Sequence, residues 1–128
     1  MIYKKILFTG ASSLLGVNWF PIISDSFEVY LAIHKKNILV PNTKRVFLNF
    51  LSNQKLIEKI SEIKPDILIN LAGLTNVETC EHNKKLANEV NVFLPRKLSY
   101  CCKTLKIKFV HISTDHLFNG KNSFYDEE

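Results

Sequence analysis

Three short runs of the chain are almost wholly apolar and have the pattern of buried strands. They span residues 5–10, 66–73 and 108–114. Nearly continuous apolar runs, unlike alternating ones, are typical of strands in a parallel sheet whose two faces are both covered by helices. Two weaker runs, residues 27–33 and 44–50, would complete a sheet of about five strands.

Apolar residues at helical spacing predict helices over residues 52–66 and 94–105. Ser52 or Asn53 would cap the first of these helices, and Pro65 would end it. In the second helix Pro95 fits only within the first turn, where its missing N–H group has no helical partner to lose. The residues assigned to the two buried stripes are Leu56, Ile57, Ile60, Ile63, Leu94, Leu98, Cys101, Cys102 and Leu105.

The alternation of strands and helices predicts the fold class. Repeats of this kind form an α/β fold, here a Rossmann-like doubly wound parallel sheet with right-handed crossovers and helices on both faces. Another helix would follow residue 13, and Pro21 should kink it or end it early. The 128 residues suffice for one domain, residues 1–128. The sheet would be truncated after about five strands, where this fold is expected to continue.

Composition and charge exclude several classes of protein. Hydrophobic residues make up 46% of the chain and charged residues 23%, which argues against a disordered or fibrous chain. Seventeen Lys and Arg against twelve Asp and Glu give a net charge of +5, but the basic residues are scattered. We therefore expect a solvated basic surface and no nucleic-acid partner. The N-terminal apolar stretch is too short for a signal peptide or a membrane span, so we expect no membrane partner.

The cysteines indicate a reducing compartment. Cys80, Cys101 and Cys102 are odd in number and have neither C-x-x-C spacing nor Cys/His spacing suited to zinc, so no metal site is expected. Reduced thiols in the cytoplasm fit this pattern best. Cys101 and Cys102 lie on the apolar stripe of a predicted helix, and we expect core residues there instead of reactive ones.

The segment "TGASSLLG", residues 9–16, is the candidate binding loop. It lies in the first strand-to-helix turn, where Gly10 permits a tight turn and Gly16 allows close packing of helix on strand. The small residues between them let the backbone approach a pyrophosphate, and the helix N-terminus supplies N–H groups to it. The strand before and the helix after favour a cofactor loop over a plain turn.

Five segments in this order, "TGASSLLG", "LNF", "INLAGLTNVETCE", "NVF" and "VHISTDHLFNG", resemble the N-terminal half of an extended short-chain dehydrogenase/reductase. They are most similar to the dTDP-4-dehydrorhamnose reductase family, whose members reduce a 4-keto group on a dTDP-linked deoxysugar with a nicotinamide cofactor. The resemblance implies an NAD(P)-binding Rossmann domain without the C-terminal lobe that binds the dTDP-sugar. Nicotinamide dinucleotide is the partner implied for this part.

The resemblance also implies which residues hold the cofactor. The pyrophosphate loop would comprise Gly10, Ala11, Ser12, Ser13, Leu14, Leu15 and Gly16. Ser13 stands where the family has its middle glycine, so its Cβ and hydroxyl could crowd the phosphate or donate to it. Asn49 and Phe50 would lie near the adenine, with Asn49 in place of the family's aspartate. Leu71, Ala72, Gly73 and Thr75 would line the cofactor beyond the fourth strand.

Residues after the second strand bear on the choice of cofactor. His34, Lys35 and Lys36 stand where an acidic residue would bind a ribose 2′-hydroxyl, and basic residues there would accommodate a 2′-phosphate. NADP(H) is therefore favoured over NAD(H), although an exposed lysine-rich turn would give the same pattern. Asn91 matches a helix asparagine of the wider superfamily, and it could equally be a helix cap.

Ser113 and Thr114 are expected to end the fifth strand at the carboxyl edge of the sheet, where ligands bind in such folds. Thr114 matches the family's catalytic Ser/Thr, which hydrogen-bonds the substrate carbonyl, and Ser113 would contact the cofactor. Asp115 follows, and His116 replaces the family's tyrosine. Capping of the next turn would explain the Ser-Thr pair equally well.

The family's general acid, the tyrosine of a Tyr-x-x-x-Lys pair, has no match: Tyr100 is followed at that spacing by Thr104, and Tyr125 is three residues from the end. Three interpretations stay open: the N-terminal part of a reductase, a free-standing nucleotide-binding or regulatory module, or a fragment of a sugar-nucleotide epimerase or dehydratase. A sheet stopped at its fifth strand leaves an edge and an apolar face, so we expect a homo-oligomer or a partner that covers them.

Overall fold

The computed structural model describes residues 4–34, 38–114, 118–122 and 125–126, and its centre is a parallel sheet in the order β3-β2-β1-β4-β5. All four strand pairings are parallel, so the predicted doubly wound fold is confirmed. The strands are β1 (Lys5–Thr9), β2 (Glu28–Ile33), β3 (Thr43–Phe47), β4 (Ile67–Asn70) and β5 (Lys108–His111).

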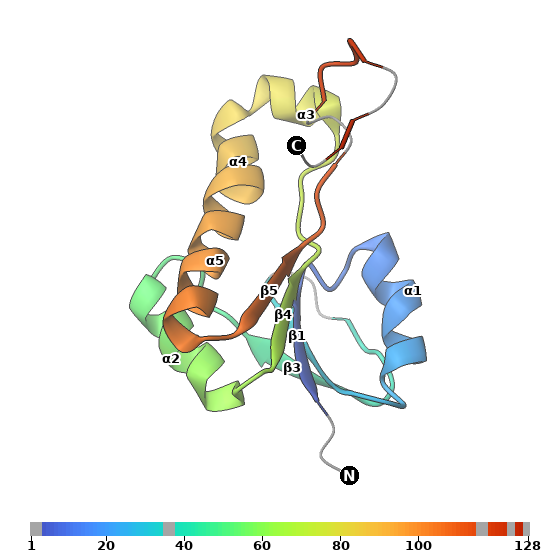
Figure 1. Cartoon of the computed structure of the whole chain (residues 1–128), viewed down its shortest axis with the longest axis vertical. Coiled ribbons are helices and arrows are strands. Elements are labelled where there is room, and N and C mark those ends of the chain that lie inside the picture. Colours follow the sequence, from blue (N-terminus) through green and yellow to red (C-terminus); the bar gives the residue numbers. More distant parts are fainter. Residues whose placement is uncertain (1–3, 35–37, 115–117, 123–124, 127–128) are drawn as a thin grey trace.

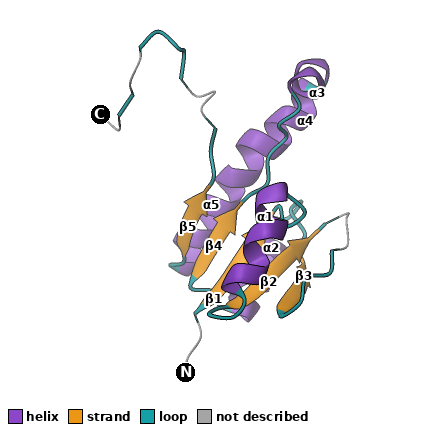
Figure 2. Ribbon diagram, turned by 90° about the vertical axis from the view of Figure 1, so that its right-hand side faces the viewer, coloured by secondary structure: helices purple, strands orange, loops and turns teal. Residues whose placement is uncertain are grey.

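Helices cover both faces of this sheet. Figure 2 shows α1 (Leu14–Ile23) on one face and α2 (Asn53–Ile63) and α5 (Leu94–Leu105) behind the other. Ser52 caps α2 by accepting from the Lys55 amide, and Pro95 lies in the first turn of α5. Both features follow the sequence prediction. Pro21 lies inside α1, which ends two residues later at Ile23.

A helical run that sequence reasoning missed joins β4 to α5. It consists of α3 (Val77–His82), α4 (Lys84–Asn88) and a π-helical turn, η1 (Glu89–Phe93), that leads directly into α5. Figure 1 shows α3 and α4 beyond the carboxyl ends of the strands. None of these short segments has a buried residue, so no apolar stripe of helical period marked them in the sequence.

Two apolar cores lie on the opposite faces of the sheet. Alternate strand residues point to opposite faces. Leu7 and Leu68, paired across β1 and β4, therefore pack with α2 and α5 in one core. Phe8 and Ile69 pack on the other face with Phe20 of α1, and the Phe8 and Phe20 ring centroids lie 4.8 Å apart.

Three strands are shorter than the apolar runs suggested. The predicted strands at 44–50, 66–73 and 108–114 end at Phe47, Asn70 and His111. The last strand loses its pairing because its neighbour β4 ends at Asn70; the final ladder bond in this direction runs from the Ile112 amide to the Asn70 carbonyl, at 3.1 Å. The sequence predicts that Ser113 and Thr114 end this strand. The structure places them beyond its end, at residues that belong to no strand.

The cysteines behave as the sequence predicts for core residues. Cys101 and Cys102 are buried on α5, and all three thiols are free. Burial raises the pKa of the Cys101 thiol; burial and the neighbouring Cys101 raise the pKa of Cys102 to about 11. Both groups are therefore protonated and unreactive near neutral pH. Among the described residues, no helix is both long and apolar enough to cross a bilayer.

Two helices end on a lysine in the left-handed conformation, where glycine is the usual residue. Lys64 follows α2 with φ 52°, and Lys106 follows α5 with φ 56°. We expect Lys106→Gly to stabilise the fold by about 0.5–1 kcal/mol because glycine has no Cβ to strain there.

The matched control for that prediction is Lys103→Gly in the last turn of the same helix. Its backbone is right-handed helical, so glycine should cost about 1 kcal/mol there. Urea denaturation of both variants measures the two free energies of unfolding. Changes of the same sign in both would contradict the assignment of strain to Lys106.

Candidate functional site

The sheet has a point where its connections change direction, between β1 and β4. The chain leaves β1 through α1 on one face, whereas the helices that lead to β4 and β5 lie on the opposite face. The carboxyl ends of parallel strands share one edge of a sheet, and ligands of open α/β sheets bind at that edge beside such a switch point. The loop after β1 and the loop after β4 are therefore the candidate site.

Gly10 opens the loop after β1 and has no room for a side chain. Its φ is +69°, and a Cβ at this position would lie 2.3 Å from the backbone nitrogen of Ala72. The Ser13 amide donates to the Gly10 carbonyl at 3.0 Å, which closes a tight turn. The predicted tight turn at Gly10 is present, and the neighbour that requires a glycine is the backbone of the loop after β4.

Ser13 is the N-cap of α1. Its backbone is extended, with φ −68° and ψ 153°, and its hydroxyl oxygen accepts from the Gly16 amide at 3.1 Å. The first turn of a helix has amides without a helical partner, and this bond satisfies one of them. The hydroxyl at the position of the expected middle glycine thus caps the start of the helix.

Gly16 was expected to let α1 pack closely on the strand, but the nearest atoms to a Cβ at this position belong to the ring of Phe20. A Cβ there would lie 2.7 Å from the Phe20 ring of the same helix and 3.1 Å from the Ala11 carbonyl oxygen. Phe20 is fully buried and packs on Phe8 of β1. Gly16 therefore allows close packing of α1 on the sheet indirectly, because it leaves space for the Phe20 ring.

Asn70, the last residue of β4, is a fully buried amide that holds the site together. Its Oδ1 accepts from the Thr9 hydroxyl at 2.6 Å and from the Ala72 amide at 3.1 Å. Its Nδ2 lies 2.9 Å from Nδ1 of His111. One side chain thus joins β1, β4, β5 and the loop whose backbone packs against Gly10.

A second amide, that of Asn91 on η1, holds the next part of the same loop. Its Oδ1 accepts from the Leu74 amide at 2.8 Å and its Nδ2 donates to the Leu74 carbonyl at 3.0 Å. The Cys80 thiol donates to the same carbonyl at 3.4 Å. Asn91 is thus no helix cap, and the π-helical turn aims it at the loop; such turns often mark functional sites. Gly73 and Thr75, which flank Leu74, are both exposed.

The residues expected at the adenine side come together in part. His34 is exposed just beyond β2, and its ring lies 6.0 Å from that of Phe50, edge to face. The Asn49 side chain bonds to its own loop, where its Oδ1 accepts from the Leu51 amide at 3.0 Å. In this conformation the Asn49 oxygen has one lone pair committed to its own loop.

Ser113 and Thr114 are exposed after β5. Lys35, Lys36, Asp115 and His116 lie outside the described residues. Farther along, the rings of Phe118 and Tyr125 stack at 4.5 Å, and the Tyr125 hydroxyl donates to Asn119 Oδ1 at 2.7 Å. The described part of the loop after β5 is thus held by its own side chains.

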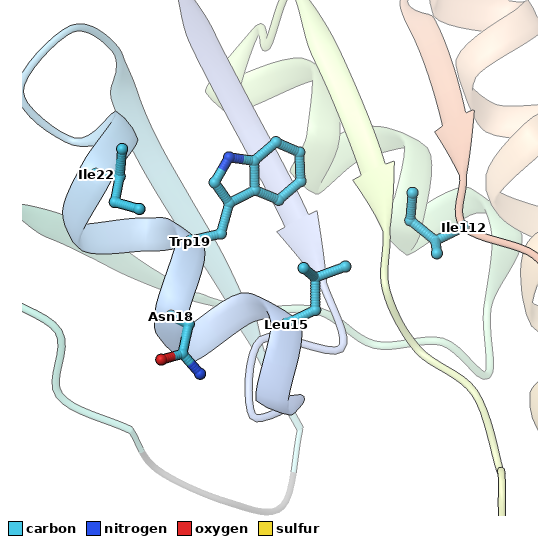
Figure 3. A pocket seen from close by; sticks show the side chains of 5 residues that line it. All are labelled: Leu15, Asn18, Trp19, Ile22 and Ile112. Atoms are coloured by element: carbon cyan, nitrogen blue, oxygen red, sulfur yellow. The ribbon is translucent and has the colours of Figure 1, made fainter.

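A shallow apolar groove of about 380 Å³ lies on the α1 side of the sheet. Figure 3 shows Leu15, Asn18, Trp19 and Ile22 on α1 with Ile112 across from them. Of the predicted cofactor residues, Leu15 alone lines this groove. In the described part of the chain, no cluster of His, Cys, Asp and Glu could hold a metal ion.

Sequence reasoning missed two residues of the site, Asn70 and His111. Asn70 is the one polar residue of the run "ILIN", and His111 is at the end of the run "KFVH". Buried polar groups require hydrogen-bond partners, so a polar residue closing an apolar run was an available signal. Register, which the sequence does not show, makes them partners: Asn70 pairs with His111 across β4 and β5.

Comparison with known proteins identifies relatives across the whole chain. Residues 4–128 match the family model described as the RmlD substrate binding domain. A probable low-salt glycan biosynthesis reductase, Agl14, from Haloferax volcanii is 37% identical over 75 residues, which are 58% of this chain and 25% of the relative.

Two solved structures are similar to most of the chain. A hypothetical dTDP-4-dehydrorhamnose reductase from Sulfolobus tokodaii is 31% identical, with a TM-score of 0.83 over 97% of this chain and 44% of its own. The Bacillus anthracis dTDP-4-dehydrorhamnose reductase, in complex with NADP, is 24% identical, with a TM-score of 0.78 over 94% of this chain and 40% of its own. The chain thus spans less than half the length of these relatives.

Proposed function

The chain belongs to the RmlD substrate binding domain family, and from this premise we propose that it forms the NAD(P)-binding part of a sugar-nucleotide reductase. The reaction would be reduction of the keto group of a dTDP-4-keto-6-deoxysugar, as the names of its relatives suggest. One observation carries the proposal: Gly10 meets the Ala72 backbone beside the capped start of α1. This contact lies at the switch point of the sheet, where such folds bind dinucleotides.

The residues of both loops suit a dinucleotide. Residues 10–16 would face the pyrophosphate, because the start of α1 presents N–H groups and the positive end of its dipole. Leu71, Ala72 and Gly73 would lie along the nicotinamide half, with Thr75 near its ribose. Gly73 leaves open space there, since a Cβ would have as its nearest neighbour the Asn91 Oδ1 atom, at 3.8 Å.

We propose NADP(H) as the preferred cofactor. The sequence from His34 to Asn37 contains no acidic residue that would bind a ribose 2′-hydroxyl. His34 is exposed beside Phe50, so its imidazole and the following Lys35 and Lys36 would accommodate a 2′-phosphate, with Asn49 and Phe50 near the adenine. The Bacillus anthracis relative was solved in complex with NADP, which supports a nicotinamide dinucleotide as the ligand.

Thr114 is the residue proposed to act in the reaction. Its hydroxyl would donate to the substrate carbonyl oxygen and stabilise the negative charge that develops there, with Ser113 beside the cofactor. When bound, the nicotinamide supplies the hydride. No tyrosine of the 128 residues is followed four positions later by lysine, so the chain alone is expected to bind cofactor without turnover.

We also propose that the protein works in the cytoplasm, where its three free thiols would stay reduced. The exposed apolar side chains Leu15, Ile22 and Ile112 form a surface that a second copy or another part of the enzyme would cover. We expect neither a nucleic-acid nor a membrane partner, because the basic residues are scattered along the sequence.

Calorimetric titration with NADPH and NADH tests the proposal. We expect saturable binding, tighter for NADPH, and weakening by about tenfold in Gly73→Ala, since a methyl group there would displace the ligand at a cost of about 1.4 kcal/mol. The fold should tolerate Gly73→Ala because a Cβ meets only ordinary contacts.

The matched control is Lys64→Gly at the opposite edge of the sheet, after α2 and before β4. It should bind NADPH as the unmodified chain does. Absence of binding by a well-folded chain, or equal affinities for the Gly73→Ala variant and the unmodified chain, would contradict the placement of the cofactor over these loops.

A further inference from the structure

Thr9, Asn70 and His111 form a row of hydrogen bonds whose directions are fixed. They are register partners across β1, β4 and β5 and point to the α2 and α5 face of the sheet, as Leu7, Leu68 and Phe109 do two residues earlier. The Ala72 amide can only donate, so the Asn70 atom that it meets at 3.1 Å must be the oxygen. The Asn70 NH₂ group therefore faces His111.

That direction fixes which form of His111 can make this hydrogen bond. The NH₂ group is a donor, so Nδ1 of His111, at 2.9 Å, must accept and carries no proton. The imidazole is then neutral, with its proton on Nε2. A second proton would place N–H against NH₂, two donors facing each other.

We propose that neutral His111 is a positioning residue of the dinucleotide site and that its protonation weakens dinucleotide binding. The effect passes through Asn70 to the Ala72 amide, and Ala72 is the backbone against which Gly10 packs. This inference rests on the proposed function, because it assigns a pH dependence to the same site.

Asn70 has no inexpensive way to adapt to protonated His111. Rotation of its amide by half a turn would point NH₂ at the Ala72 amide and withdraw the acceptor of the Thr9 hydroxyl. Asn70 is fully buried, so water cannot replace the lost partners, and an unpaired buried group is costly. His111 itself is exposed, so its ring is in contact with solvent.

Among the described residues around His111, no charged side chain is bonded to its ring. On its own strand, the Phe109 ring lies parallel to it at 6.4 Å. From β4 the facing group is the Asn70 amide. On the covering segments η1 and α5 the ionisable side chains are Glu89, Arg96, Lys97, Tyr100, Cys101, Cys102 and Lys103.

Three of those side chains are bonded elsewhere or buried, and the other four are exposed. Lys97 donates to the Phe50 carbonyl, and Cys101 and Cys102 are buried thiols. Glu89, Arg96, Tyr100 and Lys103 are exposed. Within the described ranges, none of the seven hydrogen-bonds or ion-pairs with His111. The pH response assigned to the row therefore belongs to the imidazole.

Two substitutions at His111 distinguish the effect of losing the hydrogen-bond acceptor Nδ1 from the effect of the charge on the ring. In His111→Asn the Oδ1 atom branches from the same carbon as Nδ1 and accepts at every pH, whereas His111→Phe keeps a ring without an acceptor. Titrations with NADP⁺ run from pH 8 to pH 5.5, across which histidines change charge. The 2′-phosphate of the ligand also titrates in this range, so the decisive quantity is the ratio of dissociation constants between the unmodified chain and His111→Asn.

We expect this ratio to rise from about one at pH 8 to about ten at pH 5.5, the effect of one lost hydrogen bond. His111→Phe should bind about tenfold more weakly than His111→Asn at both pH values, for the same reason. A ratio that stays near one at pH 5.5, or His111→Phe binding as His111→Asn does, would overturn the inference. Unfolding midpoints at each pH confirm that the variants compared are folded.

A ligand-free measurement keeps this test independent of the proposed function. The NMR resonances of the Ala72 amide and the Asn70 NH₂ group should shift between pH 8 and pH 5.5 in the unmodified chain and stay constant in His111→Asn. Resonances that do not titrate would overturn the coupling even if NADP⁺ binds. Resonances that titrate in a chain without NADP⁺ affinity would retain the coupling and refute the cofactor assignment.

Discussion

Gly10→Ala is expected to lower the free energy of unfolding by about 3 to 5 kcal/mol and to abolish dinucleotide binding, because backbone strain and overpacking act together. The added Cβ would lie 2.3 Å from the Ala72 nitrogen and 2.6 Å from its Cα. Neither backbone can yield without cost, since Asn70 holds the Ala72 amide and the Ser13 amide holds the Gly10 carbonyl. Urea denaturation measures the loss of stability.

Gly120→Ala separates the two sources of that cost. Gly120 has φ +73°, close to the +69° of Gly10, but a Cβ there would meet nothing within 4 Å. Its alanine variant should therefore lose about 1 kcal/mol, the strain of a left-handed residue alone. Equal losses at the two positions would show that the loop after β4 moves aside, and the close contact would then not require glycine at position 10.

The sheet could be predicted from the sequence because the patterns that indicate its strands and helices are local. The runs at 5–10, 66–73 and 108–114 are apolar on both faces, and Leu56, Ile60 and Leu98 recur at helical spacing. Such patterns reflect burial in a layered fold. Leu56, Ile60 and Leu98 lie in one of the two cores, and each of the three runs contains a strand that separates the cores.

Strand ends could not be predicted from the same signal, because apolar character continues where hydrogen-bonded pairing stops. Leu71 and Ile112 extend the apolar runs beyond Asn70 and His111, yet neither belongs to a strand. The Asn70 side chain binds the Ala72 amide, which turns the chain out of the ladder. Placing Ser113 and Thr114 at the end of a strand was wrong for this reason.

The helical run from α3 to η1 could not be predicted from apolar periodicity either. Val77 and Val92 are exposed, at 62% and 49% of their surface, so these segments cover no core and need no apolar stripe. Their contribution is polar instead: Asn91 clamps Leu74 through both atoms of its amide. A contact between residues separated by 17 positions leaves no periodic trace in the sequence.

The sequence predicts Gly10 and the residues after it as a binding loop, because glycine spacing between strand and helix is a local pattern. It does not reveal the hydrogen bonds that hold this loop in place. The roles of Asn70 and His111 depend on strand register, since they pair with each other across β4 and β5. The sequence shows a polar residue at the end of an apolar run but not which residue it meets.

Asn70→Leu is the second change for which we expect a large effect, a loss of about 3 to 4 kcal/mol of unfolding free energy. Leucine has a similar volume to asparagine, so the loss would come from buried polar groups that no longer have hydrogen-bond partners. The Thr9 hydroxyl, buried at 1% exposure, would have no acceptor in place of Asn70 Oδ1. The Ala72 amide would lose its bond to the same atom, and dinucleotide binding should weaken with the loosened loop. Urea denaturation and NADPH titration measure the two effects.

Thr9→Val provides the matched test that the loss comes from unpaired groups and not from packing. Alone it should cost about 1 kcal/mol, since Asn70 Oδ1 keeps the Ala72 amide as a donor. The double variant Thr9→Val and Asn70→Leu should lose less unfolding free energy than the sum of the two single variants, by about 1 kcal/mol or more. The reason is that valine has no hydroxyl that could be left without an acceptor. Additive losses would mean that the two side chains act independently and that Asn70 stabilises the site through its own bond to Ala72. Non-additive losses would show that β1 and β4 hold the loop as one hydrogen-bonded unit, with Gly10 on one side of it and His111 on the other.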